Sequence, residues 1–564
     1  MYHPPLSHSV TCFYWSWVKF ITTKTRAKYH RSNSTPPSSL CKTLTTELKP
    51  YTLCLVPAMA LGWSVLVSVW TGMNFQALLM FVLVFLVLLD YVKNRRPKTF
   101  PPAPPGLPFL GNLFTINFKK AHIDLTQLSV HYGNVYSLRT AQSWVVILNG
   151  YETIKEALIV QGENLADRPD SVIRTEVCQN LGLIRANGYS WKQQRRFALS
   201  TLKYFGVGKK SLEGAILDEF TYLARDLSDK NGKAFDPHLI TNYAISNIIC
   251  SLVFGHRFKY ADQRFRKMMQ LFREALELEA SIWAELYNSF PVVMGLLPGP
   301  HQEVLKNWEV VKAFVRTEIE QHKKDRDPNE NRDYIDCYLT EMEKNKADVA
   351  AGFHEENLVM CAVDLFVAGS ETTSTTLRWG FLYMAKYPEV QEKVQEEIDR
   401  VIGQSRQPSL ADRADMPYTD AVLHEVQRIG NIVPLSLHRT AAKDIQIGKH
   451  IIPKGTEIIP NLTSVMFDKS EWETPDTFNP QHFLDKEGKF VKRTAFIPFG
   501  AGKRVCLGEN LAKMELFLFF TSLLQRFSFS FPAGVMPSME YSLGVTLNPA
   551  PYEICAVPRQ PEHH

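Results

Sequence analysis

Apolar residues recur at helical spacing along most of the chain beyond residue 200. Repeats of three to four residues place such side chains on one face of a helix, and that face is then buried. We therefore expect helices over Ser211 to Asp229, Ala244 to Phe254, Phe265 to Leu286, Asn307 to Asp325, Glu355 to Lys386, Pro388 to Ile402 and Leu511 to Leu524.

Shorter apolar runs between turn residues predict strands. They occur at Trp144 to Leu148, between residues 443 and 463 around a Pro453-Lys454-Gly455 turn, and from Tyr541 to Val557. No repeat or linker-like run interrupts the chain after residue 100. The pattern predicts a mainly α fold with a minor β region, in which residues 113–564 form one domain.

A different apolar pattern occupies the N-terminal part, where no charged residue lies between Pro50 and Leu89. About 20 mostly apolar residues can cross a bilayer as a helix, and Ser68 to Leu89 supplies them. Lysine and arginine follow at residues 93, 95, 96 and 98, and such residues favour the cytoplasmic side. We expect a membrane anchor over 59–92, a single transmembrane helix, and a body that faces the cytosol. A cleaved signal peptide is the alternative, and the lack of a small-residue cleavage site after the apolar run argues against it.

A basic and proline-rich hinge is expected at 93–112, because proline fixes φ and cannot continue a helix. Residues 1–58 carry seven Lys/Arg against one acid, Glu47, and show no hydrophobic period. Three interpretations remain open. In the first, Met59 is the true start and the extension is not native. In the second, the segment is a transit peptide. In the third, it is a lumenal extension with a glycosylation acceptor at Asn33.

Composition adds few constraints. The net charge of +5 is too mild to indicate nucleic-acid binding. Nine cysteines without paired spacing argue against a disulfide framework or a covalent heme attachment motif.

One cysteine, Cys506, stands in the glycine-rich run from Phe499 to Gly508. Gly502 and Gly508 let a flat ring approach the backbone closely. Arg504 precedes the cysteine, and the expected helix from Leu511 puts the positive end of its dipole nearby. Cationic surroundings of this kind stabilise a thiolate that ligates iron. The alternative is a buried free cysteine in a turn.

A second pattern, Ala368-Gly369-Ser-Glu371-Thr372, lies inside the long helix that begins at Glu355. The Ala-Gly pair costs helix propensity and leaves room beside the backbone. Glu371 and Thr372 then place an acid and a hydroxyl at the gap, which suits proton delivery to reacting oxygen. The alternative is a hydroxyl-rich stretch of an ordinary core helix.

Glu425 and Arg428 are three residues apart on a predicted helix and have apolar neighbours. We expect a buried ion pair that fixes geometry more than it adds stability. An exposed salt bridge on the helix face is the alternative.

These motifs resemble those of the cytochrome P-450 monooxygenases over about residues 95 to 558. The loop F-x-x-G-x-R-x-C-x-G is the most specific of them, and the runs WKQQRRF, FGVGKKSLE, LPGPHQ and CLGENLAK are most similar to microsomal family two, subfamily J and its fish relatives. The resemblance implies the helical P-450 fold and heme b with Cys506 as axial iron ligand. It also implies electrons from NADPH through NADPH-cytochrome P-450 reductase, with a microsomal b-type cytochrome as an optional second donor.

The resemblance also assigns roles to further residues. Trp191, Arg195, Arg168, Arg439 and Arg504 match the positions that hold the heme propionates, and His482 matches the third member of the Glu425–Arg428 pair. Family position implies that the substrate pocket includes Arg174, Asp364, Val433 and Val545. Arg174 is a candidate partner for a carboxylate, with pairing to Glu176 or to solvent as the alternative.

The resemblance implies insertion of one atom of O2 into hydrophobic substrates, first polyunsaturated fatty acids such as arachidonate, and also xenobiotics. It implies the endoplasmic reticulum membrane, or mitochondria if residues 1–58 act as a transit peptide. Two rivals remain: a reductase-independent heme-thiolate isomerase or dehydratase, and a non-catalytic membrane heme-binding protein. The pair Glu371 and Thr372 argues against both.

Overall fold

The computed structural model describes residues 75–141, 143–535 and 538–559. The chain divides into two units, residues 1–90 and 91–564. The expectations for residues 1–58, and for the start of the anchor at Ser68, lie outside the described residues.

The N-terminal apolar run forms helix α4 (Phe75–Lys93). Its stretch Gln76–Lys93 has a mean hydropathy of 2.0, and none of it is buried within the structure. This one helix among the described residues is long and apolar enough to cross a membrane.

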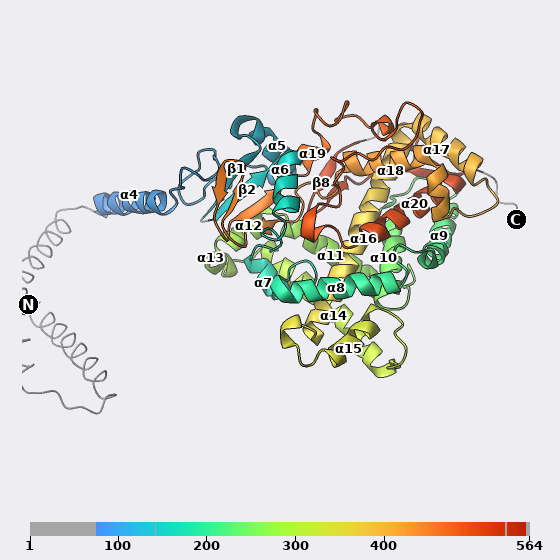
Figure 1. Cartoon of the computed structure of the whole chain (residues 1–564), viewed down its shortest axis with the longest axis horizontal. Coiled ribbons are helices and arrows are strands. Elements are labelled where there is room, and N and C mark those ends of the chain that lie inside the picture. Colours follow the sequence, from blue (N-terminus) through green and yellow to red (C-terminus); the bar gives the residue numbers. More distant parts are fainter. Residues whose placement is uncertain (1–74, 142, 536–537, 560–564) are drawn as a thin grey trace, which may run out of the picture. The chain divides into compact units, whose positions relative to one another are not determined.

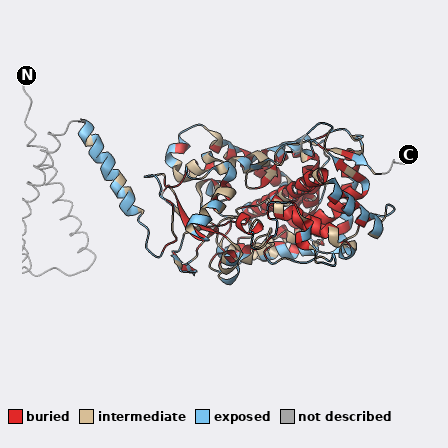
Figure 2. Ribbon diagram, turned by 90° about the horizontal axis from the view of Figure 1, so that it is seen from above, coloured by how far each residue is buried: buried red, intermediate tan, exposed pale blue. Residues whose placement is uncertain are grey.

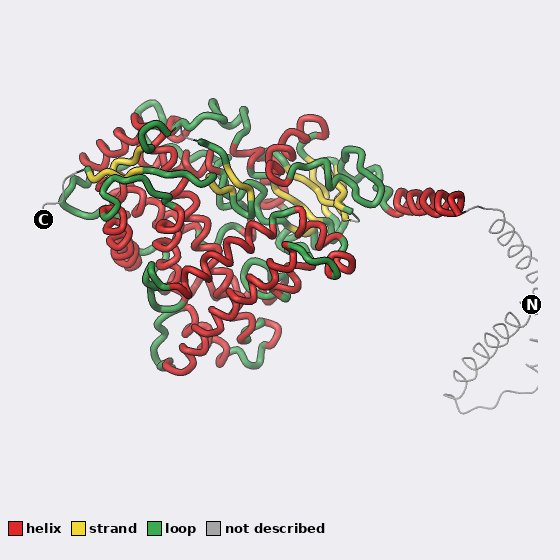
Figure 3. The backbone as a smooth tube through the Cα atoms, turned by 180° about the vertical axis from the view of Figure 1, so that it is seen from behind, coloured by secondary structure: helices red, strands yellow, loops and turns green. Residues whose placement is uncertain are grey.

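The second unit is mainly helical, as Figures 1 and 3 show. Its helices are α5 (Ala121–Tyr132), α6 (Tyr151–Lys155), α7 (Val172–Cys178), α8 (Gly188–Tyr204), α9 (Glu213–Ser228), α10 (His238–Val253), α11 (Gln263–Glu279), α12 (Ile282–Ser289), α13 (Pro291–Gly295), α14 (Pro300–Asp325), α15 (Tyr334–Lys344), α16 (Glu355–Lys386), α17 (Pro388–Val401), α18 (Pro417–Gly430), α19 (Thr463–Met466) and α20 (Glu509–Arg526).

The β region is small and joins distant parts of the sequence. Its main sheet has the order β1-β2-β6-β3, built from Val135–Thr140, Ser143–Leu148, Glu457–Pro460 and Arg439–Thr440. Strands β2 and β6 run parallel with Val145 opposite Glu457. Two-stranded sheets pair β4 (Ile445–Ile447) with β5 (His450–Ile452), β7 (Phe527–Ser530) with β10 (Cys555–Pro558), and β8 (Tyr541–Leu543) with β9 (Leu547–Pro549). The prediction of a mainly α fold with minor β structure is confirmed.

The prediction of one continuous helix over Phe265 to Leu286 is wrong. The structure breaks it into α11 and α12, because Ser281 caps the second helix and accepts a hydrogen bond from the backbone N–H of Ala284 at 3.4 Å. Helix α10 begins at His238, six residues before the predicted Ala244. Its buried polar Thr241 and Asn242 interrupt the apolar pattern, and the Thr241 hydroxyl donates to the Pro237 carbonyl instead of to water.

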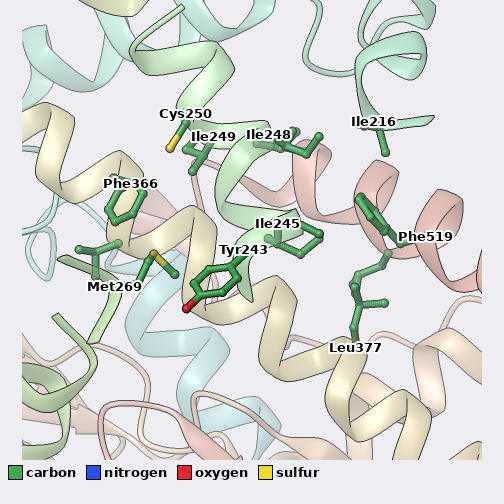
Figure 4. Close-up of a cluster of buried hydrophobic side chains, with 14 of the residues drawn as sticks. Ile216, Tyr243, Ile245, Ile248, Ile249, Cys250, Met269, Phe366, Leu377 and Phe519 are labelled. Atoms are coloured by element: carbon green, nitrogen blue, oxygen red, sulfur yellow. The ribbon is translucent and has the colours of Figure 1, made fainter. Parts of the chain in front are cut away.

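Helix α16 is buried over most of its length, and Figure 2 shows that buried residues gather in the interior of the body. Helix α10 packs along it, which Figure 4 shows at Ile249 and Phe366. The contact is close at Gly369, where a Cβ atom would lie 3.0 Å from Cγ1 of Ile249. The missing side chain of Gly369 therefore serves helix packing, a role that the sequence did not suggest.

Candidate cofactor and substrate site

Helix α16 has one accessible stripe in an otherwise buried middle section. Ala368 is exposed and Gly369 and Thr372 are half-buried, whereas their neighbours along the helix are buried. Positions i, i+1 and i+4 lie on the same helix face. The stripe forms one wall of a cavity, which we call the inner cavity.

The opposite wall of the inner cavity comes from the loop before α20 and from that helix itself. It includes Phe499, Arg504, Cys506 and Gly508, together with Leu511. Cys506 has a large accessible surface. This surface belongs to the lining of the inner cavity, so the side chain is accessible from the cavity although protein surrounds it. The structure thus brings the predicted iron ligand and the predicted Ala-Gly gap, about 140 residues apart in sequence, to the walls of one cavity.

Local contacts fix the shape of the cysteine loop. The backbone N–H of Cys506 donates to the carbonyl of Phe499 at 3.0 Å, and Arg195 donates to the carbonyl of Val505 at 2.6 Å. Gly502 has φ of +73°, and a Cβ atom there would lie 1.7 Å from the carbonyl oxygen of Leu158. Only glycine fits at this position, because the φ is left-handed and the space is filled.

The surroundings of Cys506 raise the pKa of its thiol overall, first through burial and also through the charge of Glu509. The backbone N–H of Gly508 and the charge of Arg195 act in the opposite direction. Binding of a metal cation deprotonates a coordinating thiol. The site is therefore built to receive a cation rather than to hold a free thiolate.

One edge of the inner cavity carries an excess of positive charge. Arg168, Arg195, Arg439 and Arg504 all line the cavity. None of them forms an ion pair with an acid in the part of the chain that the structure describes. Burial lowers the pKa of Arg504 to about 9, helped by repulsion from Arg439, and burial lowers the pKa of Arg439 to about 10.

These guanidinium groups donate to backbone carbonyls. Arg168 reaches Leu437 at 2.7 Å, and Arg504 reaches Ala166 at 2.7 Å. The guanidinium of Arg504 stacks 3.6 Å from the ring centre of Trp191, and the buried indole Nε1 of Trp191 has no hydrogen-bond partner among the described residues. A buried donor without a partner and several unpaired cations indicate that an anionic ligand completes this edge.

The donor set fits iron protoporphyrin IX. A thiol faces the cavity from one wall, apolar residues such as Leu365, Ile432 and Leu507 line it, and cations gather at one edge for two carboxylates. A flat, largely apolar dianion with a central metal ion matches all three properties.

The predicted acid and alcohol lie on different faces of α16. Thr372 lines the inner cavity, and its hydroxyl donates to the carbonyl of Ala368 at 2.8 Å. Glu371 is buried beside β9, where it accepts from Asn548 at 3.2 Å and from Thr546 at 3.3 Å. Its second carboxylate oxygen has no partner among the described residues, and burial raises its pKa.

A second cavity, of about 800 Å³, lies beside the main sheet. Arg174, Glu285 and Val545 line this second cavity, whereas Val433 and Asp364 line the inner cavity. Ser436 and Leu437 line both. The four predicted substrate residues are therefore divided between two adjoining cavities.

Asp364 fastens a loop to α16. One of its oxygens accepts from the backbone N–H of Leu183 at 2.6 Å and of Ile184 at 2.8 Å. Burial raises the pKa of Asp364 to about 6, although these two donors oppose the shift. Its carboxyl group holds the chain between α7 and α8 against the cavity wall.

Glu425 and Arg428 form two hydrogen bonds, at 2.7 and 2.8 Å, and both side chains are fully buried. His482 lies 3.2 Å from Glu425, and the backbone N–H of Asn479 also donates to this carboxylate. Arg428 reaches the carbonyls of Met466 and Pro475 as well. The structure brings the three residues together as one buried network that joins α18 to the segment before the cysteine loop.

Sequence reasoning missed the groups that position these side chains. Asn548 and Thr546 hold Glu371 from 177 and 175 residues away, and Asn187 accepts from Arg504 at 3.1 Å. Short motifs carry no signal for such long-range partners. The only signal in the sequence is that Thr546 and Asn548 are polar within a segment predicted as an apolar strand. Polar side chains at such positions indicate donors to a buried acceptor, here Glu371.

Fold and site together define a helical heme-thiolate protein. The family model described as Cytochrome P450 matches residues 101–556, and the chain belongs to this family of monooxygenases. Human cytochrome P450 2J2 and rat cytochrome P450 2J3 are each 49% identical over 496 residues, which cover 88% of this chain and 99% of each relative. Rainbow trout (Oncorhynchus mykiss) cytochrome P450 2K1 is 45% identical over 485 residues, covering 85% of this chain and 96% of the relative.

Proposed function

We propose that the protein is a membrane-anchored monooxygenase that oxidises hydrophobic substrates, first among them polyunsaturated fatty acids such as arachidonate. The observation that carries the proposal is the inner cavity, with Cys506 on one wall, Thr372 on the other and unpaired arginines at its edge. Bound heme would supply oxygen activation, so that with two electrons derived from NADPH and two protons one atom of O2 enters a C–H or C=C bond and the other leaves as water.

The residues around the cavity have separate tasks in this proposal. Arg168, Arg195, Arg439 and Arg504 would hold the two carboxylates of the heme. Cys506 would hold the iron through its sulfur.

Proton supply falls to Thr372 and Glu371. The Thr372 hydroxyl now donates to Ala368, and a change of rotamer would turn it toward the cavity. Glu371 keeps a proton more readily than an exposed acid, because burial raises its pKa. Since its carboxyl lies on another helix face, proton transfer to Thr372 needs a side-chain rotation or an intervening water.

The substrate proposal rests on the second cavity. Its wall combines apolar residues such as Leu113, Ile116 and Val545 with the cation Arg174. Among the described residues Arg174 has no ion-pair partner, and Glu176 instead accepts from the Tyr287 hydroxyl at 3.0 Å. Arg174 is the one lysine or arginine in this lining and the candidate contact for a carboxylate, whereas Asp170, Glu176, Glu279, Glu285 and Glu457 are its acidic members. The apolar part of the wall suits the tail of an amphipathic acid, and neutral xenobiotics fit the same apolar wall.

We further propose that α4 anchors the protein in the endoplasmic reticulum, with the body in the cytosol, and that NADPH-cytochrome P-450 reductase supplies electrons. Lys93 in the last turn of α4 and the basic residues after it support this orientation. A b-type cytochrome is the candidate second donor.

The deciding measurement is the reduced carbon-monoxide difference spectrum of protein expressed from Met59. A strongly red-shifted Soret band, absent in Cys506→Ala, would indicate a thiolate ligand. A band at the shorter wavelength of neutral or histidine ligation in correctly folded protein would contradict the proposal. NADPH-dependent oxidation of arachidonate with added reductase then separates a monooxygenase from a peroxide-using isomerase and from a non-catalytic heme protein.

A further inference from the structure

Arg378 follows Glu371 by two turns on α16, and its side chain is buried. Its Nη1 atom donates to the side-chain carbonyl of Asn548 at 3.1 Å, and Nη2 donates to the backbone carbonyl of Pro549 at 3.3 Å. Its Nε atom is buried and has no hydrogen-bond partner among the described residues. These contacts place the cation beside β9, the strand that also supports Glu371.

Two donors fix the orientation of the Asn548 amide. Its Oδ1 atom accepts from Arg378 and, at 2.7 Å, from the hydroxyl of Thr375. Because the amide oxygen only accepts and the amide nitrogen only donates, this arrangement turns the NH2 group to the other side. There Nδ2 donates to Glu371 at 3.2 Å and to the hydroxyl of Thr546 at 3.0 Å. Arg378 therefore acts on Glu371 through Asn548 rather than by a direct hydrogen bond.

The charge of Arg378 has little other compensation. Burial lowers the pKa of its guanidinium, and Tyr552, Glu371 and Asp236 oppose this shift. Tyr552 donates to the backbone carbonyl of Arg378 and stays neutral, because burial raises the pKa of its hydroxyl. Asp236 is exposed, so water and salt screen its charge. Buried Glu371 is therefore the acid that interacts most strongly with this cation when it is ionised.

Opposing influences act on the proton of Glu371. Burial raises the pKa of its carboxyl, whereas the amide of Asn548, the charge of Arg378 and the charge of Arg273 on α11 lower it. His238, at the start of α10, adds no charge near neutral pH, because burial and then the charge of Arg378 lower its pKa to about 3. An acid that must both take up and release a proton near neutral pH needs influences that offset one another in this way.

We propose that Arg378 is a positioning residue for proton supply, which through Asn548 holds Glu371 so that this acid can release its proton toward the inner cavity. The network engages one carboxylate oxygen of Glu371 and leaves the second without a partner among the described residues. That second oxygen can pass a proton to Thr372 through an intervening water. This inference rests on the proposed function and adds to it a residue that lines neither cavity.

The test first follows the Glu371 proton without turnover. Infrared difference spectra of the heme-loaded protein in phospholipid nanodiscs, recorded after pH jumps, give the carbonyl band of protonated Glu371, which Glu371→Gln removes. In Arg378→Gln the titration midpoint of this band should move upward by about one pH unit or more, because a cation and the hydrogen bond that orients the Asn548 amide are lost. Arg378→Lys keeps the charge without the fork geometry and should move the midpoint less.

A second measurement follows the use of electrons. With reductase, NADPH and arachidonate, Arg378→Gln should release at least about twofold more hydrogen peroxide per NADPH than the wild type, because a poorly positioned acid delivers its proton more slowly. Oxygen that is reduced without entering the substrate leaves as peroxide. The two measurements together separate the state of the Glu371 proton from its use.

Two further variants complete the design. Trp379→Phe is the matched control, because the indole N–H of Trp379 also ties α16 to β9, by donating to the Leu547 carbonyl at 2.9 Å. It leaves the Asn548 contacts in place and should not move the midpoint. Asn548→Ala removes the donor to Glu371 itself and should move the midpoint upward, so the test stands even if Arg378→Gln does not fold.

Several outcomes would overturn the inference. An unchanged or lower midpoint in Arg378→Gln or in Asn548→Ala does so, and so does the lack of any Glu371 carbonyl band in the wild type. Equal shifts in Arg378→Gln and Trp379→Phe would mean that Arg378 only fastens β9. Unchanged peroxide release would remove Arg378 from proton supply while oxidation stands. If the midpoints move as expected but the wild type oxidises no fatty acid with reductase and NADPH, the proposed function fails while the network stands.

Discussion

At the scale of single residues, the most constrained charges are those with no access to water. Glu425 and Arg428 are both fully buried, and the carboxylate is shared with His482 and a backbone N–H. Such a pair adds little net stability while intact, since desolvation offsets the attraction, but removing one partner leaves a buried charge uncompensated.

We therefore expect Glu425→Gln to lower the free energy of unfolding by about 3 kcal/mol or more. Urea denaturation of the heme-loaded protein in detergent measures it. Arg400 is exposed and pairs with the buried Glu397, which also accepts hydrogen bonds from Tyr418 and Thr419. Arg400→Ala leaves those donors in place and should cost less than about 1 kcal/mol. Similar costs for both variants would contradict the buried-network interpretation.

Asp364 gives a pH-dependent prediction. Its folded-state pKa of about 6 lies above the ordinary value of 3.8, so the folded protein binds this proton more tightly than the unfolded chain. The contribution to stability is complete below about pH 3.8 and is lost as the pH rises through 6. From pH 5 to 7.5 the loss should be about 1–1.5 kcal/mol.

Asp364→Asn does not titrate, and its amide oxygen can still accept from Leu183 and Ile184. The unfolding free energy of the wild type relative to Asp364→Asn should fall over pH 5 to 7.5 in urea titrations. A constant or rising difference would show that the backbone donors outweigh burial.

At the scale of elements, the sequence predicted those segments whose ends carry a local signal. The bounds of α16 match the predicted Glu355 to Lys386, because His354 caps its start and Pro388 begins the next helix. The break between α11 and α12 was missed, because one serine cap decides it. The sequence predicted the motifs around Ala368 and Cys506 but not the inner cavity that they line. The cavity forms only where α16 packs near a loop far along the chain, and no local pattern predicts that packing.

The cysteine loop allows a matched pair of glycine variants. Gly500 and Gly502 have φ of +72° and +73°, but a Cβ atom at Gly500 would have nothing within 4 Å, whereas one at Gly502 would collide with Leu158. Alanine at either position must adopt a left-handed φ, which costs about 1 kcal/mol. Only Gly502→Ala must also shift the loop away from Leu158.

We expect Gly502→Ala to lose most of its heme, measured as the ratio of Soret to protein absorbance, and Gly500→Ala to keep most of it. Equal heme content in the two variants would mean that the close approach to Leu158 does not fix the cysteine loop.

At the scale of the whole molecule, the chain combines an apolar helix with a globular body of a different character. Helix α4 exposes nearly all of its apolar side chains, whereas α16 buries most of its residues. Hydropathy alone predicted both helices. A long uniform apolar run indicated α4 and a repeat of apolar residues at helical spacing indicated α16, and these two patterns differ plainly in sequence. The partners of Glu371 and Arg504 could not be predicted, because they depend on how distant segments pack.

Deleting residues 1–94 should release the protein from membranes while the body keeps its carbon-monoxide spectrum. Ultracentrifugation of expressing cells, followed by spectra of both fractions, measures this. A truncated protein that still sediments with membranes would show that the body itself binds the bilayer.

Ser436 and Leu437 line both cavities, and this sharing has a consequence for protein engineering. A library randomised at these two positions changes substrate preference and heme retention at once. Variants with a useful substrate preference will therefore be lost from a screen when they no longer bind heme. Positions from Val172 to Glu176 line only the second cavity among the two. They are the better starting point for directed evolution, because most variants at these positions should retain heme.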